Sequence, residues 1–145
     1  MATWDDVVAM AASETGLAVV SMTRADGSPH ASVVNAGPFV HPVTGAPCVA
    51  LVARGTSVKV RRVASGARLS VTFRRGWQWA GVEGPADLIG PDHGAAGVDV
   101  PQLLRDVFVA CGGSHDDWDE YDRVMATEGR VAILAEPARI LGVSP

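Results

Sequence analysis

The sequence predicts an α+β domain in which antiparallel strands, about six in number, form a small closed barrel with helices to one side. Short β-branched segments separated by hairpin-type turns recur along the first 90 residues. Helical patterns fall mostly late in the chain, so the strand-helix alternation of a doubly wound sheet is missing, and no GxGxxG follows the first strand. The length suits a single domain over residues 1–145.

The composition is that of a globular protein and excludes several classes of partner. Apolar residues make up 48% and charged residues 19%. The acidic pI of about 5.4 argues against general nucleic-acid or membrane binding. Two cysteines without a CxxC, an acidic N-terminus and the lack of a long apolar run predict a cytoplasmic protein with reduced thiols.

The N-terminal part predicts a helix followed by a hairpin. Residues 3–14 have an amphipathic pattern with Thr3 as N-cap, and Gly16 follows the end of the helix. Residues 16–24 and 29–37 are rich in β-branched residues and are joined by an Asp-Gly turn, which predicts a hairpin over residues 16–36. The helix face expected in the core consists of Trp4, Val7, Val8 and Ala11.

The middle of the chain predicts three further strands around one short helix. A turn with two prolines and a glycine, residues 41–47, precedes the first of these strands. Thr56 or Ser57 can cap the helix, which is expected over residues 57–65 and ends at Gly66. The strands are expected at residues 48–54, at 67–74 and, long and bent, at 77–88.

The C-terminal part predicts two helices and a last strand. The first helix covers residues 102–110 after Pro101, and the second is expected to have Ser114 as its cap. Residues 130–142 form the last strand, interrupted at Pro137. The acidic run after Ser114 is interpreted as the first turn of the second helix rather than a metal site, because the four histidines lack the spacing of metal ligands.

Basic residues are concentrated in residues 54–75. This segment holds seven of the twelve Lys and Arg residues, and no acidic residue occurs between Asp26 and Glu83. Lys59 is the only lysine of the chain, beside eleven arginines. A lysine is a compact point charge, whereas an arginine is a planar fork, so a local reason for an ammonium is expected here. The segment is either a solvated basic face or a docking site for a small anion such as a phosphate.

Two other features would suit a flat ligand. Trp77 and Trp79 point to the same face if both lie on a strand, and they belong either to the core or to an aromatic wall beside a planar ligand. Residues 32–37, SVVNAG, end a strand with small residues and one amide, which would let the backbone pass close beneath a ring system. No serine lies in a GxSxG elbow, so a hydrolase triad is not predicted.

Four segments, in the order in which they occur, resemble the flavin and deazaflavin oxidoreductase superfamily. They are GLAVVSMTRADGSPHASVVNAG, SVKVRRVASGARLSV, GWQWAGVEGPADLIG and GSHDDWDEYDRVM. The resemblance covers essentially the whole chain and implies the FMN-binding split β-barrel that this superfamily shares with pyridoxamine 5′-phosphate oxidases. The subgroup that the chain resembles most is that of actinobacterial enzymes that use coenzyme F420.

The resemblance also implies a homodimer with a cofactor site in each groove between subunits. Lys59 matches a lysine that contacts the cofactor phosphate, the strand end from Ser32 to Asn35 matches the segment against the ring, and the two tryptophans match an aromatic strand near the partner's site. Close relatives often have an arginine where this chain has Ser57. The cofactor-binding residues expected on this basis are Ser32, Val33, Val34, Asn35, Arg54, Thr56, Ser57, Lys59, Arg61, Trp77 and Trp79.

The function implied is transfer of a hydride from reduced F420 to a conjugated, electron-poor small molecule such as an enone, a quinone or a tetrapyrrole like biliverdin. No catalytic side chain is assigned, because the cofactor supplies the chemistry. An FMN-dependent enzyme of the pyridoxamine 5′-phosphate oxidase type, a haem-binding relative and a non-catalytic cofactor-binding protein remain as alternatives.

Overall fold

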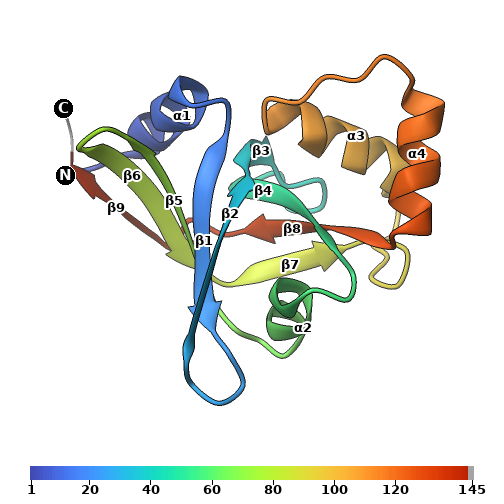
Figure 1. Cartoon of the computed structure of the whole chain (residues 1–145), viewed down its shortest axis with the longest axis horizontal. Coiled ribbons are helices and arrows are strands. Elements are labelled where there is room, and N and C mark those ends of the chain that lie inside the picture. Colours follow the sequence, from blue (N-terminus) through green and yellow to red (C-terminus); the bar gives the residue numbers. More distant parts are fainter. Residues whose placement is uncertain (144–145) are drawn as a thin grey trace.

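A computed structural model describes residues 1–143 of the chain as two antiparallel sheets with helices around them (Figure 1). The helices are α1 (Trp4–Ser13), α2 (Val58–Ala64), α3 (Val100–Ala110) and α4 (Trp118–Thr127). The strands are β1 (Leu17–Thr23), β2 (Pro29–Asn35), β3 (Gly37–Val40), β4 (Pro47–Arg54), β5 (Leu69–Arg75), β6 (Gln78–Gly84), β7 (Ala86–Ile89), β8 (Arg130–Ala135) and β9 (Arg139–Val143).

The two sheets enclose one apolar core. The five-stranded sheet has the order β2-β1-β5-β6-β9, and the four-stranded sheet has the order β3-β4-β8-β7. The inward side chains include Val20 and Phe73 from the first sheet and Leu51 and Ile133 from the second, all fully buried. Helix α1 packs on this core, whereas α3 and α4 cover the outer face of the smaller sheet around a second apolar cluster.

The described residues form nine strands rather than the six expected. The chain changes sheets at four places, and besides the change through α2, between β4 and β5, three changes fall within or directly after an expected strand. The long strand expected over residues 77–88 is two strands, β6 and β7, which belong to different sheets and part at Pro85. The last strand is likewise divided at Pro137 into β8 and β9. The two breaks meet, since the Glu136 amide donates a hydrogen bond of 2.9 Å to the Pro85 carbonyl. A proline has no N–H for a ladder, which is why each strand ends there.

Another change of sheet occurs at Ala36, between β2 and β3. The Ala36 amide donates to the Gly16 carbonyl at 2.7 Å, and the Asn35 side-chain amide donates to the Thr15 carbonyl at 2.9 Å. The end of α3 lies against the next residue, because a Cβ at Gly37 would be 2.1 Å from the Ala110 carbonyl oxygen. Three backbone segments can therefore meet here only if Gly37 has no side chain.

The N-terminal caps of α1 and α2 are residues that the sequence analysis named, and a proline lies at the start of α3 as it expected. Thr3 forms a capping box with Asp6 on α1, and Ser57 caps α2. The cap of α4 is Asp117 rather than Ser114, because the Asp117 carboxylate accepts the Glu120 amide at 3.1 Å. Val8 was expected in the core but is exposed. No helix in residues 1–143 combines the length and apolarity that a membrane span requires.

The contact at Gly37 generates a stability prediction. Gly37→Ala should lower the free energy of unfolding by about 1–3 kcal/mol, because the new methyl group must displace the α3 backbone. Gly94→Ala is the matched control, since a Cβ there has no heavy atom within 4 Å. Urea unfolding monitored by circular dichroism measures both. Equal stability of the two variants would show that the crossing tolerates a side chain.

Candidate functional site

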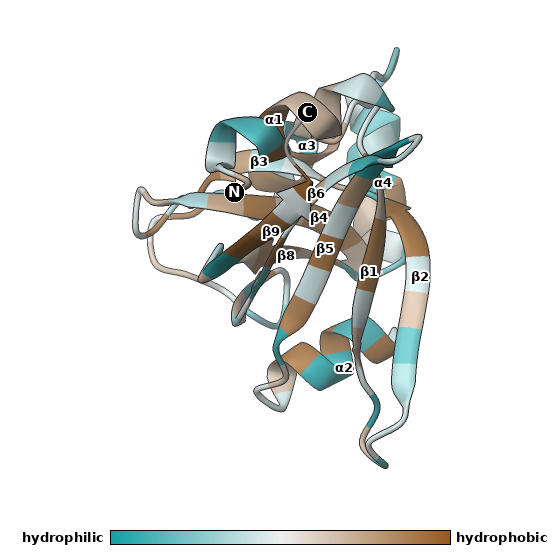
Figure 2. Ribbon diagram, turned by 90° about the vertical axis from the view of Figure 1, so that its left-hand side faces the viewer, coloured by the Kyte–Doolittle hydropathy of each residue, from teal (hydrophilic) through white to brown (hydrophobic). Residues whose placement is uncertain are grey.

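Helix α2 presents the middle of the basic segment below the strands β1 and β5 (Figure 2). Val60 and Val63 are buried and anchor the helix to the core, so Lys59 and Arg61 lie on its remaining faces. The Ser57 hydroxyl accepts the Val60 amide at 3.2 Å, and Thr56 is exposed in the preceding turn. The helix has seven residues, and its own cap occupies the Val60 amide at its N-terminus.

The central contact of the site is between Lys59 and Ser32, which are 27 residues apart in the sequence. The Lys59 ammonium Nζ donates to the Ser32 hydroxyl at 3.1 Å, and both residues are half-buried. Burial lowers the pKa of Lys59 below its usual 10.5, and no nearby charge contributes to this shift. No acidic side chain of residues 1–143 pairs with Lys59 within salt-bridge distance. A half-buried cation without a counter-ion is a site where an anion would be stabilised.

The strand end from Ser32 to Asn35 is divided between two faces of its sheet. Residues alternate along β2, so Ser32 and Val34 face inward, whereas Val33 and Asn35 face outward. Val33 is 68% exposed, and the Asn35 amide is bonded to the Thr15 carbonyl at the crossing. Only Ser32 and Val34 of this segment therefore share a face with Lys59.

The arginines of the basic segment do not gather into one patch. Arg61 is exposed on α2, one position beyond Val60. The Arg62 guanidinium donates to the Thr23 carbonyl at 2.9 Å and joins the helix to the β1–β2 hairpin. Arg54 lies 3.6 Å from the Glu128 carboxylate, at the base of α4. Arg61 lies two residues after Lys59, and it forms no ion pair with an acidic side chain of the described residues.

The two tryptophans do not lie side by side on one strand face. Trp77 is 96% exposed in the turn between β5 and β6, at the end of β5 remote from α2. Trp79 is half-buried on β6, where it is in register with Arg74 and Val143 on the outer face of the large sheet. These positions do not bring either tryptophan to the Lys59–Ser32 pair of the same chain.

The outer face of the large sheet carries an apolar row that the sequence analysis did not identify. The strand registers place one residue of each strand in this row, which crosses the sheet from edge to edge. Its members are Val33, Val19, Thr72, Gly81 and Leu141. Leu17, Trp79 and Val143 lie one row further toward α1 on the same face. Alternating strands usually turn polar residues outward, so this row is an unusual surface for an uncovered sheet.

Two hollows of the chain lie away from Lys59. One, of about 580 Å³, is a shallow groove on the same outer face, lined by residues that include Ser21, Arg68 and Arg139. The other, of about 280 Å³, is lined in part by His41, Cys48 and Asp87. The Lys59–Ser32 pair lies instead at an edge strand, where one wall of a binding groove would have to come from another chain.

His41 is a buried polar residue with a structural role. Its Nδ1 accepts the Val43 and Thr44 amides at 3.1 and 3.3 Å, so Nε2 carries the hydrogen and donates to Asp87 at 2.8 Å. This arrangement holds the β3–β4 turn against β7. Burial, together with the Asp87 charge, raises the pKa of the neighbouring Cys48 to about 11, so this thiol is not an activated nucleophile.

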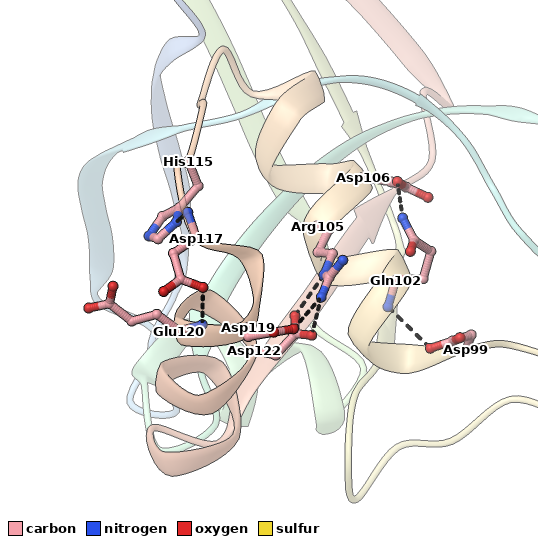
Figure 3. Close-up of polar contacts among 9 residues, drawn as sticks. All are labelled: Asp99, Gln102, Arg105, Asp106, His115, Asp117, Asp119, Glu120 and Asp122. Atoms are coloured by element: carbon pink, nitrogen blue, oxygen red, sulfur yellow. Dashed lines mark hydrogen bonds and ion pairs between the residues drawn. The ribbon is translucent and has the colours of Figure 1, made fainter.

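The acidic run at residues 115–120 belongs to the packing of α4 on α3 (Figure 3). Asp119 and Glu120 lie in the first turn of α4. Asp116 and Asp117, which were expected there after a Ser114 cap, precede the helix, and Asp117 is its cap. The Arg105 guanidinium forms two hydrogen bonds with the Asp122 carboxylate, at 2.9 and 2.5 Å, and this holds the pKa of Asp122 below its usual value. These contacts fasten the two helices together and do not form part of the Lys59 site.

No family model matches the sequence. Among solved structures, the conserved hypothetical protein Rv2991 from Mycobacterium tuberculosis superposes with a TM-score of 0.67 at 16% identity, over 98% of this chain and 84% of that one. An F420 reductase superposes with a TM-score of 0.63 at 10% sequence identity, over 97% of this chain and 98% of that one. A Lactobacillus delbrueckii protein assigned as a pyridoxamine 5′-phosphate oxidase superposes with a TM-score of 0.53 at 11% sequence identity, over 97% of this chain and 93% of that one. The chain therefore has the fold of these F420 reductase-like and pyridoxamine 5′-phosphate oxidase-like proteins.

Proposed function

We propose that this chain is an oxidoreductase that binds coenzyme F420 beside Lys59 and transfers a hydride to a conjugated, electron-poor small molecule. The observation that carries the proposal is the half-buried Lys59 ammonium, which is hydrogen-bonded to Ser32 and has no acidic partner among the described residues. The fold shared with an F420 reductase is consistent with it. A flavin or deazaflavin is the class of cofactor that such a fold and such an anion site would accommodate.

Each site residue has a role in this proposal that follows from its chemistry. Lys59 retains two free ammonium hydrogens after its bond to Ser32, and these would contact the cofactor phosphate. Arg61 would add a second cation from the same helix. Val34, on the same face of β2, would give an apolar contact to the ring. The bound cofactor itself would supply the hydride chemistry, and the protein would position the acceptor and exclude water.

A second copy of the chain would complete the site. The apolar row defined above leaves Val19, Val33 and Leu141 exposed on a sheet face that no described helix covers. Antiparallel pairing of two such faces would bury this row and bring the partner's residues to the edge strand β2. The exposed Trp77 is suited to such a contact, because aromatic residues are enriched at interfaces. We therefore propose a homodimer with Trp77 and Trp79 near the partner's cofactor.

The preference for F420 over FMN follows from charge. F420 carries a phosphodiester and a polyglutamate tail, and so has more negative groups than FMN. Arg61 is exposed on the same helix as Lys59 and forms no ion pair with the described residues, so it remains available to such a tail. Exposed charge pairs of this kind weaken as salt screens them.

The first prediction concerns cofactor binding. Lys59→Ala should weaken F420 binding roughly tenfold to a hundredfold, the loss expected when a charge-assisted hydrogen bond is removed. Lys59→Arg should restore only part of the affinity, because a fork approaches a phosphate differently from a point charge. Isothermal titration with F420 and FMN at two salt concentrations measures these effects. Unchanged binding by Lys59→Ala would place the phosphate elsewhere, and equal or tighter binding of FMN would favour a flavin enzyme.

The second prediction concerns the cost of burying Lys59. Because its pKa is lowered in the folded chain, the unfolded chain binds more protons between that pKa and 10.5, and stability rises with pH across this interval. At neutral pH the buried ammonium therefore opposes folding. Lys59→Met should be at least as stable as wild type at neutral pH, and its advantage should shrink as the pH approaches 10.5. Denaturant unfolding at both pH values tests this, and a stability loss at neutral pH would contradict it.

The third prediction concerns assembly. Light scattering at micromolar concentration should give about twice the chain mass of 15.0 kDa. Val19→Glu should shift the protein toward the monomer, because it places a charge within the apolar row. Val43→Glu is the matched control, since Val43 is also exposed but lies in the β3–β4 turn. A wild-type particle of 15.0 kDa would overturn the proposed dimer.

A further inference from the structure

His30 has a buried ring nitrogen that nothing in the described chain satisfies. It lies on β2, in register with the buried Met22, and its Nδ1 atom is buried without a hydrogen-bond partner. Buried polar atoms of native proteins are nearly always paired, so an orphan of this kind calls for an explanation. His93 has a similar orphaned nitrogen, but it lies in the turn after β7 and not on β2, the strand that carries Ser32.

The position of His30 relates it directly to the proposed cofactor site. Residues alternate along a strand, so His30 shares the inward face of β2 with Ser32 and Val34. Residues two apart on one face of a strand are separated by roughly 6.6–6.8 Å. Ser32 itself is 3.1 Å from the Lys59 ammonium. An anion held between Ser32 and Lys59 is therefore within reach of a third polar side chain on the same strand.

The inward face of β2 changes in polarity along its length. His30 and Ser32 are polar and lie toward the β1–β2 hairpin, whereas Val34 and the fully buried Ala36 lie toward the crossing. A ligand with one anionic end and one flat apolar end would match this order in only one orientation. Its phosphate would lie at the His30 end, and its ring would lie at the Val34 end.

We propose that His30 is a third phosphate-binding side chain of this site, beside Lys59 and Ser32, and that it thereby sets the direction in which the cofactor lies along β2. The proposal rests on the proposed function, because it assumes that the site takes a phosphate-bearing flavin or deazaflavin. Binding would bring phosphate oxygens to an imidazole whose Nδ1 has no hydrogen-bond partner among the described residues. The imidazole would donate one hydrogen bond to the phosphate.

The test compares ligands with and without a phosphate. F420 and FMN carry a phosphate, whereas riboflavin and the corresponding deazariboflavin do not. His30→Phe keeps a flat ring but removes both ring nitrogens, so it should weaken FMN and F420 binding roughly threefold to tenfold and leave the phosphate-free ligands unchanged. His30→Gln, which keeps a donor, should recover part of the affinity. The readout is equilibrium fluorescence titration, with circular dichroism to confirm the fold.

Val34→Ala is the control for the other end of the face, and it should weaken ligands with and without phosphate by the same factor. Competition by inorganic phosphate gives a second readout that needs no riboflavin binding, since phosphate should displace FMN less effectively from His30→Phe. FMN binding by His30→Phe at wild-type strength would overturn the inference, and so would an equal loss of riboflavin binding. If Lys59→Ala also binds FMN and F420 normally, the proposed function fails too. If only His30→Phe binds normally, the inference alone fails.

Discussion

The contact between Gly37 and the end of α3 determines where the strand that carries the site must stop. A side chain at Gly37 would occupy the space of the Ala110 carbonyl, and the Ala36 amide is bonded to Gly16 in the turn after α1. Three segments that are distant in sequence are thereby fixed to one another. The chain leaves the large sheet at this point and enters the small one, so β2 becomes an edge strand. Its outer backbone edge is therefore not paired with a further strand of the described residues.

That edge position explains how a charged lysine is tolerated in a largely apolar neighbourhood. Lys59 extends from a helix anchored by Val60 and Val63 to the Ser32 hydroxyl, and its ammonium is half-buried without a counter-ion. Burial of this kind opposes folding, which lowers the pKa of the group. A fold that keeps such a cost at one position usually does so at a binding site, where a ligand supplies the missing charge.

Local elements of the fold were predictable because their signals lie within a few residues. The β1–β2 hairpin has its Asp-Gly turn, α1 has its capping box, and α2 has Ser57 as its cap. Other features were missed because they depend on contacts between distant segments. Pro85 and Pro137 each marked a bend, but only the hydrogen bond from the Glu136 amide to the Pro85 carbonyl shows that β6–β7 and β8–β9 change sheets at one place.

The sequence likewise indicated individual residues of the site but not the contacts between them. The resemblance pointed to both Lys59 and Ser32, but their contact spans 27 residues, and no spacing rule reports it. The resemblance also grouped Val33 and Asn35 with Ser32, although the pleat turns them to the opposite face. A lone histidine has no spacing signal, so the sequence analysis considered His30 and His41 only as metal ligands and set them aside. Strand alternation would have placed His30 beside Ser32 once β2 was assigned.

The lysine side chain itself gives the most direct measurement of the central claim, that Lys59 holds the anionic group of a cofactor. Because Lys59 is the only lysine, labelling with ¹³Cε-lysine yields one side-chain NMR signal to follow with pH. The account predicts a titration midpoint below 10.5 in the free protein, which rises when F420 binds and its phosphate stabilises the ammonium. If F420 binds in the same sample, as shown by its fluorescence, and neither the signal nor the midpoint moves, the account is contradicted.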